Sequence, residues 1–304
     1  MKTACLYLSM ALLIVSISPA AAQSSATEKY ESSMLGLSRS KGLSLDQKAD
    51  QLKQIYDAEF AQTVTTARPS DDELEALFKA ANMMASYTLL RDHQDNPIYV
   101  GHMRHALSEL QRRNLAGDRE IKEMYGALIA ARMFEEASAI AKRSPTLDLP
   151  QPPSIDTPAG FDQGRPAYFE IEGATGQLKL KNDAQTRGVR IIVVAGCHVS
   201  LDAANAIASD KELQGAFHKA NTLWLTPAER TLDIAEISEW NRKFPQSPMR
   251  IAYTNRSWQG LDFSNKPTFY FYKDGVLLSK HVGWSRGGVP APILTALREA
   301  RLIR

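Results

Sequence analysis

The stretch that decides the fold is Arg190–Ser200, which reads RIIVVAGCHVS and lies in the second half of the 304-residue chain. Its five apolar residues, Ile191–Ala195, form a short continuous run, as is typical of a strand that helices bury on both faces. Gly196 ends the run, and a helical pattern begins near Asp202. Cys197 is therefore predicted between the end of a central strand and the start of a helix. The free N–H groups and the positive end of the helix dipole favour a thiolate there.

This thiol stands alone once the N-terminus is considered. The other cysteine, Cys5, lies within a predicted secretory signal over residues 1–22, where Lys2 provides the positive charge and Leu6–Ile17 the apolar core. The small residues Ala20–Ala22 predict the cleavage site. The signal predicts export, to the bacterial periplasm or otherwise by secretion. Exported proteins often pair their cysteines, so a single thiol is either buried and inert or kept for intermolecular chemistry.

Composition limits the classes of partner. The chain is 44% hydrophobic and 23% charged, which is typical of a soluble globular protein, and its formal net charge is +2. This near balance gives no reason to expect nucleic acid or an anionic membrane as a partner. No segment after the signal is long enough to span a bilayer. The length predicts about two domains.

Spacing and composition divide the mature chain into four parts. A Ser-rich flexible leader is predicted over 23–42, a helical domain over 43–144, a Pro-rich linker over 145–166, and an α/β domain over 167–304. In the helical domain, Ala130, Phe134 and Ala137 are weakly similar to a tetratricopeptide repeat. A small helical bundle without true repeats is the other interpretation. We expect this domain to mediate homodimer formation or client docking.

The α/β domain has a recognisable order of elements. Its predicted strands are 167–171, 177–181, 191–195, 221–225, 249–253, 268–272 and 276–281, and its predicted helices are 201–219, 232–244 and 290–302. Lys273–Gly275 is the turn between the last two strands. The fold class is therefore α+β overall, with an all-α domain followed by an α/β domain that has a central mixed sheet.

Two separated motifs make this order similar to the thioredoxin fold. The motifs are Gly196–Ser200 (GCHVS) and Lys266–Gly275 (KPTFYFYKDG), and the resemblance covers roughly residues 168–304. It implies that Pro267 is a cis-proline placed against Cys197. It also implies that backbone groups of Lys266, Pro267 and Thr268 bind an extended client peptide.

The departures from the thioredoxin pattern limit the chemistry. The usual Cys-x-x-Cys has become Cys-x-x-Ser, so Ser200 replaces the thiol that normally resolves a mixed disulfide. Gly196 replaces the usual Trp, and Ile191 stands where a buried acid is usual. A self-contained dithiol reductase or oxidase is therefore disfavoured. What remains is monothiol exchange by Cys197, of an isomerase-like or client-retaining kind.

The candidate catalytic residues are Cys197 as nucleophile, His198 as a stabiliser of its charge, and Ser200 as a hydrogen-bond donor to sulfur. The expected partners are protein clients with thiols or disulfides, and a small thiol such as glutathione. The loop Arg256–Gly260 is a candidate edge of the client groove. We expect no cofactor. We also expect no metal, because His102 and His105 share a predicted helix but have no tight third ligand.

Two alternatives stay open at the level of sequence. The first is a non-catalytic thioredoxin-fold binding or scaffold module in a cell-envelope assembly, in which Cys197 is unreactive. The second is a one-cysteine peroxidase, which is weaker because the Pro/Thr pattern expected before a peroxidatic cysteine is missing.

Overall fold

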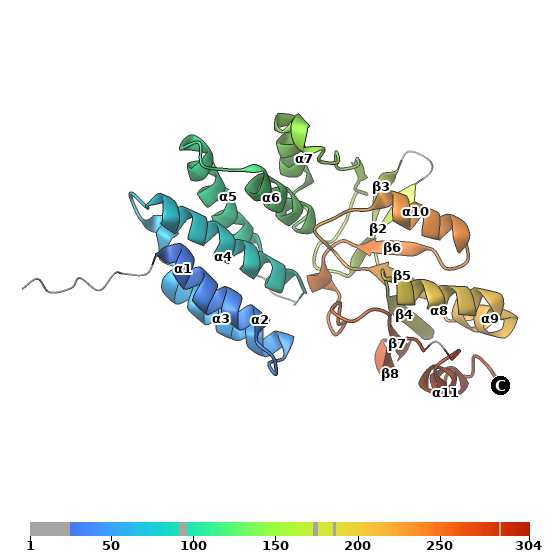
Figure 1. The fold of residues 1–304 in the computed structure, drawn as a ribbon. Helices are drawn as coiled ribbons and strands as arrows, with labels where there is room; N and C mark the ends of the chain where they lie inside the picture. The colour runs from blue at the N-terminus through green and yellow to red at the C-terminus, as the bar shows by residue number, and fades with distance from the viewer. Residues whose placement is uncertain (1–24, 91–95, 173–175, 185–186, 286) are drawn as a thin grey trace, which may run out of the picture.

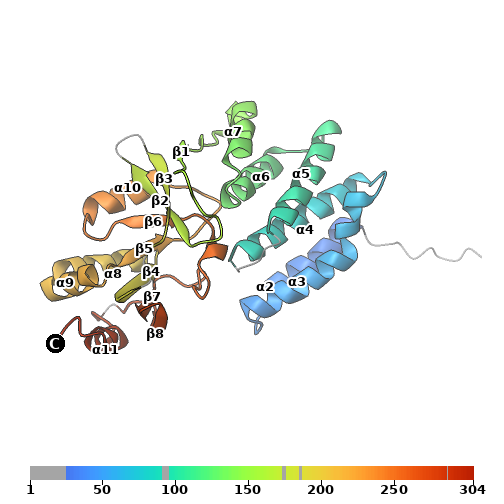
Figure 2. The same ribbon diagram turned by 180° about the vertical axis from the view of Figure 1, so that it is seen from behind.

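The computed structural model describes residues 25–90, 96–172, 176–184, 187–285 and 287–304, so the predicted signal over 1–22 lies outside the described residues. Within these residues, the helices α1–α7 come first. They are followed by an eight-stranded sheet whose helices are α8–α11. The two halves lie side by side in both ribbon views (Figures 1 and 2). No helix of the described residues is long and apolar enough to cross a membrane.

The helical half begins before the predicted domain over 43–144 and ends at Arg143. The helices are α1 (Ala26–Tyr30), α2 (Gly36–Arg39), α3 (Leu45–Glu59), α4 (Asp71–Leu90), α5 (Asn96–Arg112), α6 (Asp118–Ala130) and α7 (Phe134–Arg143). Ser44 caps α3: its hydroxyl accepts a hydrogen bond from the Gln47 N–H at 3.1 Å, and the Gln47 side chain accepts one from the Ser44 N–H at 2.9 Å. Such a reciprocal pair satisfies two N–H groups that a helix start otherwise leaves free.

The predicted flexible leader over 23–42 is wrong for its described part. Residues 26–39 are helical, with a π-helical turn at Glu31–Leu35 between α1 and α2. Met34 is fully buried, and the N–H of Ala26 donates to the Asp72 carboxylate at 2.5 Å. The segment is polar overall, but a few apolar side chains at helical spacing are enough to dock it on the helical core.

The Pro-rich segment over 145–166, predicted as a linker, also contributes a strand to the sheet. It contains β1 (Ile155–Asp156), which pairs in parallel with β3 (Gln177–Asn182) at one edge of the sheet. In addition, the Tyr125 hydroxyl of α6 donates to the carbonyl of Pro150 at 2.5 Å. The segment is therefore bound to both halves of the molecule.

The sheet has the order β1-β3-β2-β6-β5-β4-β7-β8. Its other strands are β2 (Ala167–Glu172), β4 (Val189–Val194), β5 (Leu223–Thr226), β6 (Met249–Ala252), β7 (Thr268–Lys273) and β8 (Val276–Val282). The strand β4, which precedes Cys197, pairs in parallel with β5 and antiparallel with β7, and β7 pairs antiparallel with β8. This mixed sheet confirms the predicted thioredoxin-like α/β domain.

Strand β4 is buried on both faces, as its apolar run predicts. Ile191 and Val193 pack into the large hydrophobic cluster that includes side chains of α8 (His198–Ser209), α9 (Lys211–Lys219), α10 (Ile234–Lys243) and α11 (Ala291–Glu299). Ile192 and Val194 point to the opposite face and a second, smaller cluster. The helices α8–α11 therefore cover one face of the sheet.

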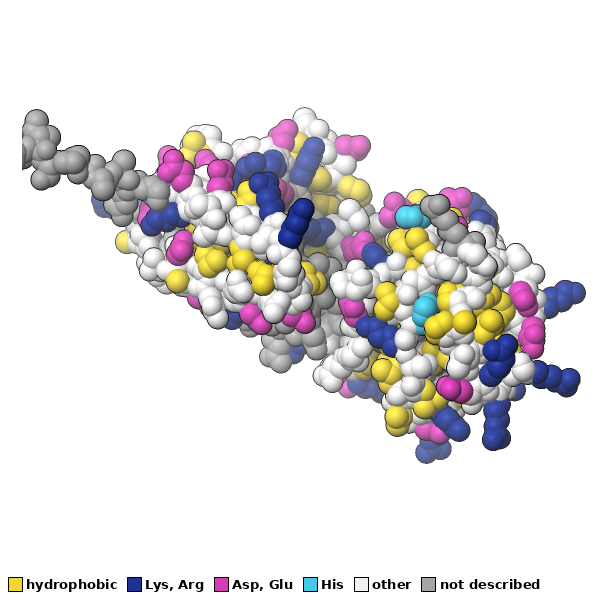
Figure 3. All heavy atoms as spheres, turned by 60° about the horizontal axis from the view of Figure 1, so that its bottom comes forward, with side chains coloured by type: hydrophobic (Ala, Val, Ile, Leu, Met, Phe, Trp, Pro, Cys, Tyr) yellow, Lys and Arg dark blue, Asp and Glu magenta, His cyan; other side chains and the backbone are white. Residues whose placement is uncertain are grey.

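One predicted helix of this half differs from the structure, and its outer strand has an unusual surface. The single helix expected over 201–219 is two helices, because Asp210 accepts hydrogen bonds from the Glu212 and Leu213 N–H groups and starts α9. The outer strand β8 leaves four large apolar side chains on the surface, namely Val276, Leu277, Leu278 and Val282. Figure 3 shows hydrophobic side chains scattered among charged ones on the sheet half.

Candidate thiol site and its groove

Cys197 lies where the sequence predicts it, between β4 and α8. It is the N-cap residue of α8, and its side chain is half-buried. It is the only cysteine among the described residues and forms no disulfide there. The sulfur therefore lies at the N-terminal end of a helix, on a residue that is only partly buried.

Gly196 allows the chain to turn from the strand into the helix. Its φ of +128° lies in a region that L side chains rarely adopt. A Cβ at this position would lie 2.9 Å from the Thr226 hydroxyl oxygen at the end of β5. Glycine is therefore required at this position, because the end of β5 occupies the space that a side chain such as Trp would need.

Ser200 contacts the sulfur, as predicted. Its Oγ lies 3.4 Å from the Cys197 Sγ and accepts hydrogen bonds from the Gly196 and Cys197 N–H groups at 3.3 and 3.4 Å. Ser200 is fully buried. It therefore orders the start of α8 beneath the sulfur and does not meet a client directly.

The segment before β7 contacts the Cys197 sulfur. The Lys266–Pro267 peptide bond is cis, and the Cys197 Sγ donates to the Lys266 carbonyl oxygen at 3.2 Å. The two motifs that carry the family resemblance thus meet in space. The Lys266 ammonium group forms an ion pair with Glu229 at 2.5 Å, which holds this segment against the loop that follows β5.

Thr268 does not belong to a client-binding surface, contrary to the expectation. It is fully buried, and its hydroxyl donates to the Asn265 carbonyl at 2.7 Å. As the first residue of β7 it pairs with Val194. Pro267 is buried too, and its carbonyl already accepts from the Gly283 N–H at 2.7 Å. The antiparallel strands β4 and β8 take the positions that a client would need there.

A groove of about 420 Å³ opens beside Cys197. His198, the first residue of α8, is exposed and lines this groove. The hydrogen-bond contacts of the Cys197 Sγ are with the Ser200 Oγ and the Lys266 carbonyl oxygen. The apolar part of the groove comes from Leu201, Pro227, Leu232, Ile237, Trp240, Met249 and Ile251.

The groove is acidic along the wall formed by α10 and the loop before it. Asp233, Glu236 and Glu239 line it, together with Glu229, whose charge is paired with Lys266, and with Lys243. The sequence argument missed this wall because its residues lie 32 or more positions after Cys197 in the chain. The signal available was topological: the carboxyl ends of parallel neighbours such as β4 and β5 meet at one edge of the sheet.

The helical half supports the loop that carries Glu229. The Arg230 guanidinium donates to the Asn82 carbonyl of α4 at 3.0 Å. The Asn255 side chain donates to the Leu89 carbonyl at 2.8 Å, and its oxygen accepts from the Ala228 N–H at 2.7 Å. One wall of the groove is therefore positioned by contacts with α4.

The loop Arg256–Gly260 does not edge this groove, contrary to the prediction. Arg256, Ser257, Trp258 and Gln259 line a different cavity, together with Ile192. Ile192 points away from the face on which α8 and α10 pack. The loop follows β6 and folds over the opposite face of the sheet, which its position before Pro267 in the sequence did not indicate.

Comparisons with known proteins add little to this picture. No family model matches the chain, and no curated protein matches it. Among solved structures it is similar to a thioredoxin-like protein from Bacteroides caccae, with 16% identity, 86% of this chain and 95% of that chain covered, and a TM-score of 0.28. A similarity this weak supports no conclusion. The second half of the chain has a thioredoxin-like fold, as its own topology shows. Its strands β5-β4-β7-β8 are neighbours in that order, Cys197 follows the central strand β4, and Pro267 precedes β7, the antiparallel neighbour of β4.

Proposed function

We propose that this chain is an exported monothiol protein that exchanges disulfides of client proteins through Cys197. The observation that carries the proposal is the half-buried Cys197 at the start of α8, which lines a groove with apolar and acidic walls. A thiol in such a place is reachable by a peptide and keeps ordered polar neighbours. The predicted signal peptide supports the exported location.

The exchange needs no second cysteine in this chain. The Cys197 thiolate attacks one sulfur of a client disulfide, a bond forms between these two sulfurs, and the other client sulfur leaves as a thiolate. The proton lost by Cys197 passes to solvent or to that leaving thiolate. A second client thiolate then attacks the client sulfur held by Cys197, and Cys197 leaves as a thiolate that takes up a proton again. The net reaction rearranges a disulfide and consumes no oxidant or reductant.

The groove indicates the chemistry of the client. Its acidic wall favours a peptide with Lys or Arg next to the reacting cysteine, and its apolar residues favour a neighbouring hydrophobic side chain. Glutathione carries a net negative charge at neutral pH, so the same wall disfavours it as the exchange partner. We therefore propose basic protein segments as clients.

A second candidate function has an observation of its own. The Cys197 thiol already donates a hydrogen bond to the Lys266 carbonyl oxygen at 3.2 Å, so its proton has a partner within the chain. A thiol held in this way is a weaker nucleophile. This contact favours the alternative of a non-catalytic binding module in a cell-envelope assembly, in which the groove binds a client and no bond forms.

The test is exchange with two model disulfides. The full chain is mixed with symmetric disulfides of a short cysteine peptide that has either Lys or Glu on both sides, and the mixed disulfide is followed by mass spectrometry. We expect the Lys peptide to react about tenfold faster, because complementary charge raises association rates. Adding a second thiol peptide should displace the first.

Matched variants assign the result. Cys197→Ala retains Cys5, so any adduct that it still forms is subtracted. The double variant Glu236→Gln/Glu239→Gln should bring the two peptides towards equal rates, whereas Glu212→Gln on α9 should not. An adduct that forms at Cys197 only in denaturant would rule out the exchange function. Binding of the Lys peptide to the folded chain without an adduct would then support the binding module.

A further inference from the structure

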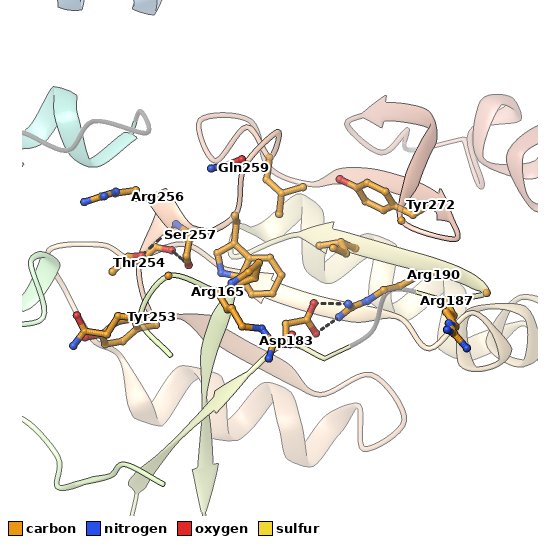
Figure 4. Close-up of a pocket in the computed structure, with 18 residues that line it drawn as sticks. Arg165, Asp183, Arg187, Arg190, Tyr253, Thr254, Arg256, Ser257, Gln259 and Tyr272 are labelled. Atoms are coloured by element: carbon orange, nitrogen blue, oxygen red, sulfur yellow. Dashed lines mark hydrogen bonds and ion pairs between the residues drawn. The ribbon is translucent and has the colours of Figure 1, made fainter. Parts of the chain in front are cut away.

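The face of the sheet opposite the helices carries a second cavity. Its buried cluster draws its members from the strands and from the loop between β6 and β7, as far as the described residues go: Ile192, Val194, Leu223, Leu225, Ala252, Trp258, Phe263 and Tyr270. A cavity of about 820 Å³ opens there (Figure 4), compared with about 420 Å³ at Cys197. This volume falls within the range of roughly 300–1,000 Å³ that is usual for small-molecule sites.

The charged residues of this cavity are mainly cationic. Arginines 165, 187, 190 and 256 line it, against Asp183 as the lining carboxylate. Arg190 and Asp183 form a two-pronged ion pair, with 2.7 Å between Nη2 and Oδ1, and their side chains are only 10% and 13% exposed. Because this pair neutralises itself, the other three arginines give the cavity its positive charge.

Arg165 is placed to meet a ligand. One of its guanidinium nitrogens, Nη2, donates to the Asp183 carbonyl at 3.2 Å, and the side chain is exposed. Figure 4 shows it beside the Asp183–Arg190 pair, with Arg187 and Arg256 further out on either side. A guanidinium has five N–H donors, so Arg165 keeps donors for an anion.

The apolar part of the cavity is suited to a ring. Ile192, Leu261 and the half-buried Tyr272 line it together with Trp258. The Trp258 indole is fixed, because its N–H donates to the Ala167 carbonyl at 3.1 Å. Burial raises the pKa of Tyr272, so its hydroxyl stays protonated at neutral pH and is a hydrogen-bond donor. Aromatic walls and guanidinium groups together match a flat ligand with an acidic group.

We infer that this cavity binds a small aromatic organic anion, at a site separate from Cys197 and on the other face of the sheet. The inference does not depend on thiol exchange. The acid group of the ligand pairs with Arg165, and its ring lies against Tyr272. The two cavities thus differ in charge: the cavity at Cys197 is acidic and this one is basic.

The probes are two fluorescent dyes with the same ring system. One is 1-anilinonaphthalene-8-sulfonate, which is anionic, and the other is N-phenyl-1-naphthylamine, which lacks the sulfonate. We expect the sulfonate dye to bind the full chain saturably, with one site per chain, and more tightly than the neutral dye. Its affinity should fall with added salt, because screening weakens an exposed charge interaction.

Two substitutions on the cavity wall test the location. Arg165→Gln should weaken the sulfonate dye about tenfold, as expected for loss of a charged hydrogen bond. Gln259→Glu adds a negative charge to an exposed cavity residue of the same shape and should also weaken it. Neither variant should change the affinity of the neutral dye.

Controls separate the site from general dye binding. Arg104→Gln on α5 and Gln246→Glu in the loop after α10 change charge elsewhere and should leave both affinities unchanged. Circular dichroism of each variant checks its folding, and Gln259→Glu keeps the test valid if Arg165→Gln does not fold. Equal affinity for the two dyes, or sulfonate binding that survives both wall variants, would overturn the inference.

Discussion

At the scale of single residues, local motifs correctly predicted the position of Cys197 between a strand and a helix, but only some of the residues around it. The contact of Ser200 with the sulfur follows from a three-residue spacing at a helix start, and such geometry is local. The cis bond before Pro267 followed from the family resemblance. The acidic wall and the burial of Thr268 did not follow from the sequence, because both depend on which strands lie beside β4.

If Cys197 exchanges disulfides as proposed, one substitution at Ser200 tests that chemistry. Its Oγ is 3.4 Å from the Cys197 Sγ, so Ser200→Cys would place a second thiol within reach of the first with a small adjustment. We expect this variant to release a mixed disulfide by intramolecular attack, without a second client thiol. The measurement is the lifetime of the peptide adduct, followed by mass spectrometry after the excess peptide is removed.

Ser200→Ala is the control for this change. It removes the hydroxyl without adding a thiol, so its adduct should last as long as that of the unchanged chain. If the Ser200→Cys adduct is equally long-lived in a folded protein, the two sulfurs do not meet and the proposed attack is wrong.

At the scale of elements, most helices and strands could be predicted from periodicity and turn residues. The hairpin β7–β8 around Lys273–Gly275 and the cap at Ser44 are examples, since each depends on a few adjacent residues. The segment over 23–42 could not be predicted in this way. Its helix depends on burial of Met34 and on the Asp72 contact, and both partners come from tertiary packing.

The docking of this segment gives a prediction for stability. Met34 is fully buried, so Met34→Ala should lower the free energy of unfolding by about 2–5 kcal/mol, as other large-to-small core substitutions do. Urea unfolding of the full chain measures this value. Ser32→Ala, which changes an exposed residue two positions earlier, should have little effect. A Met34→Ala chain as stable as the original would mean that the segment is not docked in solution.

At the scale of the whole molecule, polar contacts join the two halves. Arg132, in the turn after α6, donates to the Tyr253 carbonyl at 2.7 Å and to the Ala252 carbonyl at 2.6 Å, both at the end of β6. Burial lowers its pKa to about 10, so the guanidinium is still charged at neutral pH. Arg230 and Asn255 add the contacts to α4. The helical half is thus hydrogen-bonded to the loops that follow β5 and β6, and the loop after β5 carries Glu229 of the thiol groove.

Alanine substitutions at two helical glycines test how closely α6 packs against the loop after β5. A Cβ on Gly101 of α5 would meet nothing within 4 Å, so Gly101→Ala should stabilise the chain by roughly 0.5–1 kcal/mol through helix propensity alone. A Cβ on Gly126 of α6 would lie 3.3 Å from the Arg230 Cβ and 3.4 Å from its carbonyl oxygen. The gain should therefore be smaller or reversed for Gly126→Ala, as measured by urea unfolding.

The same pair separates a structural effect from a functional one. Arg230 follows Glu229, so movement of its backbone shifts the acidic wall beside Cys197. Gly126→Ala should therefore reduce the preference for the Lys peptide in disulfide exchange, while Gly101→Ala leaves it unchanged. If both variants gain stability equally and keep the preference, the contact between α6 and the loop after β5 is looser than the structure has it. The helical half would then not position the groove through this contact.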